Sequence, residues 1–93
     1  MNTRQHLPSL MIVDDDSLIR DSLRLALADS FEMHLADSRS QAIKMLRSMV
    51  TPPQLALVDL GLPPTPHRPT EGFRLIAELL AHSTSIKIIV LSG

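Results

Sequence analysis

The sequence contains no cysteine, no run of basic residues and no long apolar segment. Without cysteine, the chain can form neither disulfide bonds nor thiolate metal sites. The net charge of -1 excludes the basic surface that nucleic-acid-binding domains carry. No apolar segment approaches the roughly 20 residues that a membrane-spanning helix needs. Met1–Leu10 lacks the apolar core and the small-residue cleavage site of a secretion signal, so we expect a cytoplasmic protein with no membrane contact.

What is present indicates one small soluble domain. The length of 93 residues, with 44% hydrophobic and 20% charged residues, is typical of a single globular unit. Residues 1–9 are polar and include Pro8, and we expect a flexible tail there. Residues 10–93 are expected to form the folded domain.

Apolar patterning divides residues 10–93 into alternating strands and helices. Three short, nearly uniform apolar runs, at 10–13, 55–58 and 86–91, are typical of strands buried on both faces. Residues 31–35 alternate apolar with polar, which indicates a half-exposed strand at a sheet edge. Between these runs, apolar residues recur at helical spacing. The predicted apolar helix faces are Ile19, Leu23, Ala26 and Leu27; Ala42, Met45, Leu46 and Met49; and Phe73, Ile76, Ala77 and Leu80.

Three polar residues are predicted to cap the amino termini of these helices. Asp16, Ser38 and Thr70 each precede a helical pattern, and their side-chain oxygens can accept hydrogen bonds from unpaired backbone N–H groups. Ser38 and Gln41 have the spacing of a capping box, in which each side chain satisfies a backbone donor near the other.

The alternation of strand and helix predicts an α/β fold. Crossovers of this length are right-handed and give a doubly wound parallel sheet with helices on both faces. A four-stranded sheet has two edges, yet only 31–35 has the pattern of an edge strand. The run at 86–91 should therefore have a neighbour that these residues do not contain, and we expect the domain to be C-terminally incomplete. Such an unprotected edge could pair with another copy of the chain or with another protein.

Acidic and hydroxyl side chains follow three of the predicted strands. Asp14, Asp15 and Asp16 come directly after the first, Asp59 closes the third and Ser92 ends the last. Ligands of open parallel sheets bind at the carboxyl ends of the strands. Crowded carboxylates repel one another unless a proton or cation intervenes, and oxygen ligands of this kind suit Mg²⁺.

An aspartate beside Mg²⁺ can attack a phosphoryl group and form an aspartyl phosphate. The hydroxyl of Ser92 could then donate a hydrogen bond to a phosphoryl oxygen. Each residue alone has an ordinary explanation, because aspartates after strands are often helix caps or turn residues. Their joint placement at three strand ends is what favours a functional site.

Three segments resemble the receiver domain of bacterial response regulators. Leu-Met-Ile-Val-Asp-Asp-Asp (10–16) resembles that family's first strand and acidic pair. Leu-Val-Asp-Leu-Gly-Leu-Pro (57–63) resembles its phosphoacceptor strand, and Ile-Ile-Val-Leu-Ser-Gly (88–93) resembles the strand that ends in its switch hydroxyl. The resemblance covers residues 10–93. It implies a flavodoxin-like sheet of strand order 2-1-3-4 that lacks the family's fifth strand and last helices.

The resemblance also implies a role for each motif residue. Asp59 would be the phosphoacceptor, and Mg²⁺ would be held by Asp14, Asp15, Asp59 and the backbone carbonyl of Gly61. Ser92 and Gly93 would bind the phosphoryl group as switch hydroxyl and adjoining small residue. The implied donor is a sensor histidine kinase or a phosphotransfer protein, and the implied output is transcriptional. The domain would be a switch rather than a turnover enzyme.

Two departures from the family's pattern are visible. The phosphate-binding lysine of the family ends a fifth strand that is not present here, and Lys87 lies inside the fourth strand instead. The loop after Asp59 is long. Leu-Gly-Leu-Pro-Pro followed by Glu-Gly-Phe resembles a subgroup of receivers fused to sigma-54-activating ATPase and helix-turn-helix domains.

Two other functions stay open from the residues. Without the lysine and fifth strand, the chain could be a non-switching interaction module. Alternatively, Asp14-Asp15-Asp16-Ser17 has the outline of the haloacid-dehalogenase-like phosphatases, in which Asp14 would be the nucleophile and Asp16 the general acid. The phosphatase hypothesis leaves Asp59 without a role.

Overall fold

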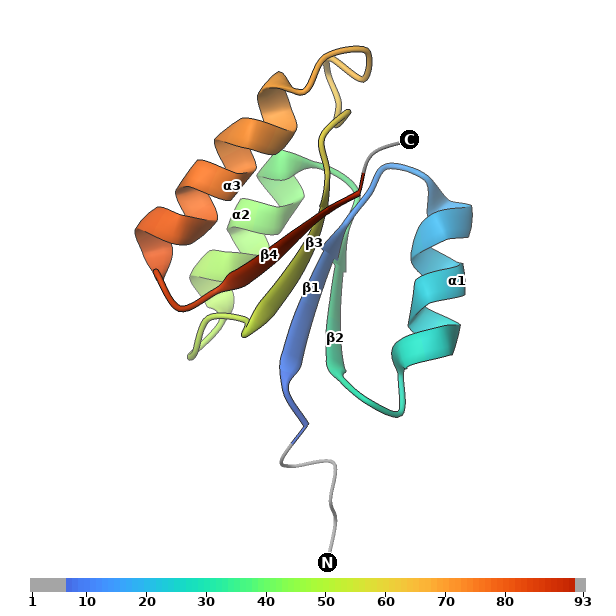
Figure 1. The fold of residues 1–93 in the computed structure, drawn as a ribbon, viewed down its shortest axis with the longest axis vertical. Coiled ribbons are helices and arrows are strands. Elements are labelled where there is room, and N and C mark those ends of the chain that lie inside the picture. Colours follow the sequence, from blue (N-terminus) through green and yellow to red (C-terminus); the bar gives the residue numbers. More distant parts are fainter. Residues whose placement is uncertain (1–6, 92–93) are drawn as a thin grey trace, which may run out of the picture.

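The computed structural model, which describes residues 7–91, contains one parallel sheet with the strand order β2-β1-β3-β4. Helix α1 lies on one face of the sheet, and α2 and α3 lie on the other (Figure 1). The predicted doubly wound α/β fold and the strand order are therefore confirmed. The elements are β1 (Ser9–Val13), α1 (Ser17–Leu27), β2 (Glu32–Ala36), α2 (Arg39–Ser48), β3 (Leu55–Asp59), α3 (Thr70–His82) and β4 (Lys87–Leu91).

The first strand begins one residue earlier than predicted. Ser9, which we expected in the tail, pairs with Glu32 in β2, and the carbonyl of Pro8 accepts a hydrogen bond of 2.9 Å from the Glu32 N–H. Residues 1–6 of the predicted tail lie outside the described residues. Within the described part of the chain, no helix is long and apolar enough to cross a membrane.

The uniform apolar runs are buried because their residues alternate between two cores. On the face covered by α2 and α3, Met11 and Val13 pack with Val58 and with Leu62 from the loop after β3. On the other face, a smaller cluster forms around β1 and α1. Its buried members and their α1 neighbours are Leu10, Ile12, Leu57, Leu23 and Leu27.

The helix faces follow the predictions unevenly. In α2, Ala42 and Leu46 are buried as predicted. In α3 the predicted face is wrong, because Leu75 and Leu79 are buried while Phe73 is 56% exposed. The sequence of α3 is apolar on more than one side, so spacing alone does not identify the side that packs on the sheet.

The amino termini of the helices also differ from one another. Asp16 caps α1 by accepting a hydrogen bond from Leu18 N, and Ser38 caps α2 by accepting one from Gln41 N, as predicted. The Gln41 side chain bonds to the N–H of Asp37 rather than to that of Ser38. The prediction for Thr70 is wrong: it is the first residue of α3, which begins after Pro69 and has no side-chain cap.

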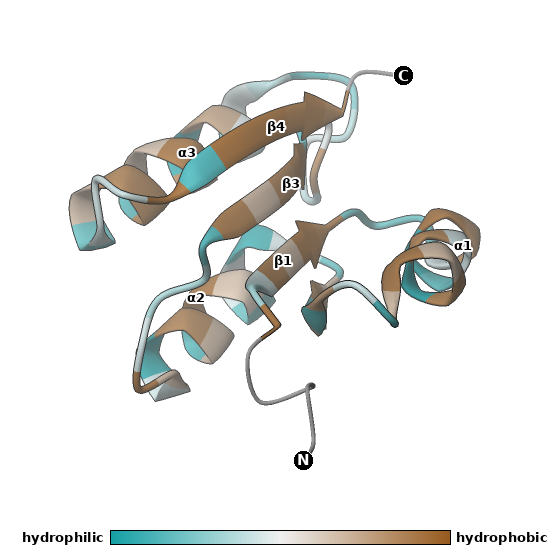
Figure 2. Cartoon of the chain, turned by 60° about the horizontal axis from the view of Figure 1, so that its bottom comes forward, coloured by the Kyte–Doolittle hydropathy of each residue, from teal (hydrophilic) through white to brown (hydrophobic). Residues whose placement is uncertain are grey.

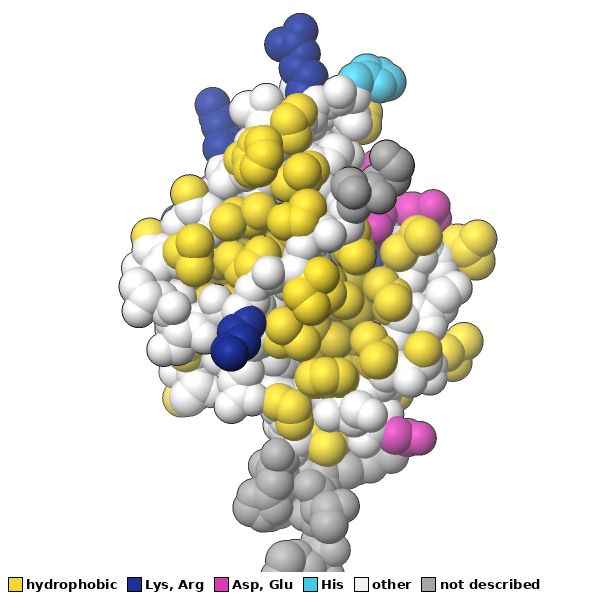
Figure 3. Space-filling view, in the orientation of Figure 1, with side chains coloured by type: hydrophobic (Ala, Val, Ile, Leu, Met, Phe, Trp, Pro, Cys, Tyr) yellow, Lys and Arg dark blue, Asp and Glu magenta, His cyan; other side chains and the backbone are white. Residues whose placement is uncertain are grey.

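Helix α1 covers only part of its face of the sheet. It contains no buried residue, and its Leu18 and Leu25 are 72% and 81% exposed. Strand β4 is hydrophobic along its length apart from its first residue, Lys87 (Figure 2). It nevertheless lies at the outer edge of the sheet, with Ile89 50% exposed. Hydrophobic side chains consequently gather on the surface that runs from β4 toward α1 (Figure 3).

Candidate metal-binding acidic site

The sheet places the predicted carboxylates side by side. Strands β1 and β3 are parallel neighbours, and Val13 lies opposite Val58. The next residues, Asp14 and Asp59, therefore lie side by side at the carboxyl ends of the two strands. One carboxylate oxygen each from Asp14, Asp15 and Asp59 lies within 4.8 Å of the others. The structure therefore brings these three predicted residues together. Ser92 and Gly93 lie outside the described residues.

Asp14 is the most enclosed member of the group, at 7% exposure. Its Oδ1 accepts a hydrogen bond of 2.9 Å from the backbone N–H of Asp16. Burial raises the pKa of Asp14, and the negative charges of Asp59 and Asp15 raise it further, against the lowering effect of that hydrogen bond. A cation placed among these carboxylates would offset this cost.

The carboxylate of Asp16 caps a helix and does not join the other three carboxylates. Its Oδ1 accepts a hydrogen bond of 2.9 Å from Leu18 N at the start of α1, and it is not a member of the three-carboxylate group. This geometry fits the predicted structural cap. It does not favour the phosphatase hypothesis, in which Asp14 and Asp16 would work on one substrate.

Arg20 of α1 contacts the backbone of the segment that carries Asp14 and Asp15. Its Nη1 donates a hydrogen bond of 2.7 Å to the backbone carbonyl of Asp14. This contact ties α1 to the end of β1 and so restrains the backbone that carries Asp14 and Asp15. Sequence reasoning did not assign Arg20 to the site, because its helical spacing suits a solvated face equally well.

Two glycines let the chain close tightly around Asp59. The N–H of Gly61 donates a hydrogen bond of 3.0 Å to Asp59 Oδ1, and a Cβ on Gly61 would lie 2.5 Å from the carbonyl oxygen of Pro66. A Cβ on Gly72 would lie 2.3 Å from the Cα of Leu60. The first turn of α3 therefore rests directly on the backbone beside Asp59. A glycine in a helix, where it costs stability, was the available sequence signal for this close approach.

The acidic residues line two adjoining hollows. In the first, of about 380 Å³, Asp15, Asp59 and Gly61 face His67 and Arg68 from the long loop after β3. The second, of about 760 Å³, extends from Asp14 and Asp59 across Leu23 of α1 to Val90 and Leu91 of β4. A small phosphorylated group can therefore approach Asp59 from solvent.

The donor set suits a hard divalent cation. The three side chains offer oxygen ligands only, and Gly61, whose backbone carbonyl is the fourth predicted ligand, lines one hollow with Asp15 and Asp59. Mg²⁺ takes one or two carboxylates and completes its shell with water and phosphate oxygens. The residues present therefore fit the predicted cation.

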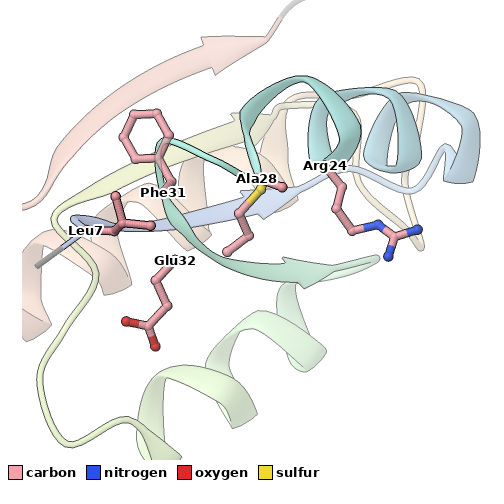
Figure 4. A pocket seen from close by; sticks show the side chains of 6 residues that line it. Leu7, Arg24, Ala28, Phe31 and Glu32 are labelled. Atoms are coloured by element: carbon pink, nitrogen blue, oxygen red, sulfur yellow. The ribbon is translucent and has the colours of Figure 1, made fainter. Parts of the chain in front are cut away.

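A separate hollow of about 290 Å³ lies where α1 ends and β2 begins, at the opposite end of the strands from the carboxylates (Figure 4). Apolar side chains make up most of its wall, and no group of acidic residues enters it. The residues that line it are Leu7, Arg24, Ala28, Phe31, Glu32 and Met33. The hollow holds one carboxylate, that of Glu32, and so differs from the three convergent carboxylates at the other end of the sheet.

Comparison with known proteins identifies this arrangement. Residues 10–93 match the response regulator receiver domain family. The chain belongs to that family. Its fold is similar to that of a receiver domain protein from Methanospirillum hungatei JF-1, with a TM-score of 0.80 and 27% identity over 94% of this chain. A receiver protein from Pseudomonas putida is similar at a TM-score of 0.76 and 28% identity, again over 94% of this chain.

The receiver is shorter than the proteins it resembles. It spans 65% of the Methanospirillum chain and 69% of the Pseudomonas putida chain. A Burkholderia pseudomallei response regulator, solved with a phosphorylated aspartic acid and a calcium ion, shares the fold at a TM-score of 0.78 and 23% identity. In that pair, 92% of this chain is matched to 47% of the other. No curated protein matches the sequence.

Proposed function

We propose that this receiver takes a phosphoryl group onto Asp59 with the help of Mg²⁺. The observation that supports the proposal is the convergence of Asp14, Asp15 and Asp59, whose carboxylate oxygens lie within 4.8 Å of one another at the end of a parallel sheet. A structural cap explains one aspartate at such a place, as it does for Asp16, but it does not explain three that converge.

The residues around Asp59 suggest how the transfer proceeds. The Gly61 N–H holds Oδ1 at 3.0 Å, which leaves the other carboxylate oxygen available to attack phosphorus. A bond forms between this oxygen and phosphorus while the bond from phosphorus to the donor breaks, and the leaving group takes the electron pair and a proton. A bound Mg²⁺ would neutralise the charge that builds between the carboxylates and the phosphoryl oxygens. Asp14 and Asp15 would hold that cation beside Asp59.

The donor we propose is the phosphohistidine of a sensor kinase or of a phosphotransfer protein, in the cytoplasm. The supporting observations are membership of the receiver family and the open hollow beside Asp59. The phosphorylated state would control an output domain, which we propose to be transcriptional. The roles of Ser92 and Gly93 in holding the phosphoryl group stay predictions.

The direct test uses acetyl phosphate with Mg²⁺ and intact-mass measurement of the folded chain. The expected result is the mass of one added phosphoryl group in wild type and none in Asp59→Asn. Asp21→Asn is a matched control, because Asp21 is an exposed carboxylate on α1 outside the acidic group. Equal labelling of the Asp59→Asn variant, or no labelling of wild type that circular dichroism shows to be folded, would overturn the proposal.

A non-switching interaction module is the second candidate. The observation that favours it is the exposure of β4, whose Ile89 and Val90 are 50% and 44% exposed. In this case the folded chain would bind a protein through that strand whether or not Asp59 carries a phosphoryl group. Binding that is identical for wild type and Asp59→Asn, together with no labelling of Asp59, would favour this function over the first.

A further inference from the structure

The loop that joins β3 to α3 lies at the carboxyl end of the strands, where the acidic residues converge (Figure 1). Its Leu62 is fully buried in the core beneath α2 and α3, which anchors the loop to the body of the domain. The N–H of Thr65 then donates to the carbonyl of Leu62 at 3.2 Å, and the N–H of Arg68 donates to the carbonyl of Thr65 at 3.0 Å. These two turns keep the loop close to the end of β3.

The second of these turns packs against Gly61. A Cβ on Gly61 would lie 2.5 Å from the carbonyl oxygen of Pro66, so only a residue without a side chain allows this approach. The same glycine donates its N–H to Asp59 Oδ1 at 3.0 Å. The turn is therefore held beside the residue that orients the Asp59 carboxylate. As a result, Arg68 lines one hollow with Asp15 and Asp59.

Arg68 brings to this hollow a positive charge that no carboxylate in the described part of the chain neutralises. Its side chain is exposed, and within residues 7–91 its guanidinium forms neither an ion pair nor a hydrogen bond. Arg39 and Arg74, in contrast, both pair with Glu71. A guanidinium presents a planar fork of N–H groups that matches the oxygens of a phosphoryl group. Arg68 is therefore suited to bind an anion in the hollow.

A phosphoryl group on Asp59 would be such an anion. Transfer replaces the single negative charge of the Asp59 carboxylate with about −1.5 to −2 on the phosphoryl group, together with three acceptor oxygens. The site thus becomes more negative, although Asp14 and Asp15 already contribute carboxylates to it. A bound Mg²⁺ would offset only part of this charge. The attraction between Arg68 and the hollow therefore increases when Asp59 is phosphorylated.

We propose that Arg68 binds the phosphoryl group on Asp59, with its guanidinium N–H groups donating to the phosphoryl oxygens. This inference rests on the proposed phosphorylation of Asp59 and adds a residue of the β3–α3 loop to that site. During transfer, the same N–H groups donate to the phosphoryl oxygens of the transition state, over which negative charge is spread. Arg68 therefore increases the rate of phosphorylation and stabilises the phosphorylated state.

NMR with beryllofluoride, an analogue of a phosphoryl group on a carboxylate, tests the contact without turnover. The Nε–H signal of Arg68 in the ¹⁵N-labelled chain, assigned by its loss in Arg68→Gln, should shift when beryllofluoride and Mg²⁺ are added. The Nε–H signal of Arg47, an exposed arginine on α2, is the internal control and should not shift. An unmoved Arg68 signal, while the backbone amides of Asp59 and Gly61 shift, would refute the contact and leave the proposed function intact.

Labelling kinetics measure how much Arg68 contributes. Arg68→Gln should lower the rate of labelling by acetyl phosphate and raise the dissociation constant for beryllofluoride, each roughly threefold to tenfold, because one exposed charge-assisted contact is lost. Arg47→Gln removes the same charge elsewhere and should change neither quantity.

Thermal unfolding separates this role from a structural one. The Tm of Arg68→Gln should equal that of wild type, because the exposed Arg68 side chain makes no contact that stabilises the fold. Wild-type labelling and beryllofluoride binding in Arg68→Gln would overturn the inference alone. A folded wild-type chain that takes neither acetyl phosphate nor beryllofluoride would overturn the proposed function and this contact together.

Discussion

Gly72→Ala should destabilise the receiver and disturb Asp59, although alanine is the better helix former. The added Cβ would lie 2.3 Å from Leu60 Cα, 2.8 Å from Leu60 O and 2.9 Å from Asp59 O. All three are backbone atoms, of Asp59 at the end of β3 and of Leu60 directly after it, so no side chain can rotate to relieve the contact. None of the glycines has a positive φ angle within residues 7–91, so the penalty comes from close approach alone.

The magnitude follows from two opposing effects. Alanine in place of glycine inside a helix gains up to about 1 kcal/mol. Overpacking costs about 1–3 kcal/mol and more where backbone must move. We therefore expect a net loss of about 1–2 kcal/mol, which for a domain of this size lowers Tm by roughly 4–16 °C. Because the displaced segment holds Asp59 and Gly61, labelling by acetyl phosphate should also slow at temperatures where the variant is folded.

Thermal unfolding followed by circular dichroism measures the first effect, and the rate of labelling measures the second. Thr70→Ala is the control in the same helical turn. Thr70 makes no capping hydrogen bond and is exposed, so its removal should change stability by less than about 0.5 kcal/mol. Unchanged Tm and unchanged labelling in Gly72→Ala would refute the claim that α3 rests on the backbone of Asp59 and Leu60.

Three further predictions concern charge and capping. In metal-free buffer, Asp14→Asn should raise Tm at neutral pH. The pKa of Asp14 in the folded chain lies above its ordinary value, so between these two pKa values the folded state binds more protons than the unfolded state. The stability of wild type therefore falls as pH rises through this window. Wild type should lose stability through that window relative to the variant, and parallel pH profiles would contradict this. Arg39→Gln should cost about 1–2 kcal/mol in urea unfolding, since Arg39 donates to the buried Glu71 at 3.0 Å, whereas Lys44→Gln should cost almost nothing. Ser38→Ala should cost about 1 kcal/mol in the same assay by removing the cap of α2, and no loss would show that the cap is not needed.

Much of the fold could be predicted because the local patterns and the packing agree. The runs in β1 and β3 are apolar at every position, and the structure buries both of their faces between helices. The polar alternation at 31–35 corresponds to β2, whose Glu32 is exposed and whose Ala36 is buried, at one edge of the sheet. The same reasoning predicted that Asp14 and Asp59 lie together at the carboxyl ends of two neighbouring strands, and the structure confirms this placement.

The rest depends on contacts that a pattern does not contain. Strand β4 has the composition of a buried strand, but the described residues provide no neighbour for its outer edge, and Ile89 stays half exposed. Thr70 has the residue type of a cap, but the chain enters α3 through Pro69 in a conformation that leaves the cap bond unmade. The contact of Arg20 with the Asp14 carbonyl joins residues six apart through a side-chain conformation that spacing does not determine.

The most direct measurement of the central claim is an NMR titration of the ¹⁵N-labelled chain with Mg²⁺. If Asp14, Asp15 and Asp59 hold one cation, backbone amides of the loop after β1 and of the loop after β3 should shift together with a single dissociation constant. Asp59→Asn should weaken binding at both loops alike. Shifts confined to one loop, or two loops that titrate with different constants, would contradict a shared cation site.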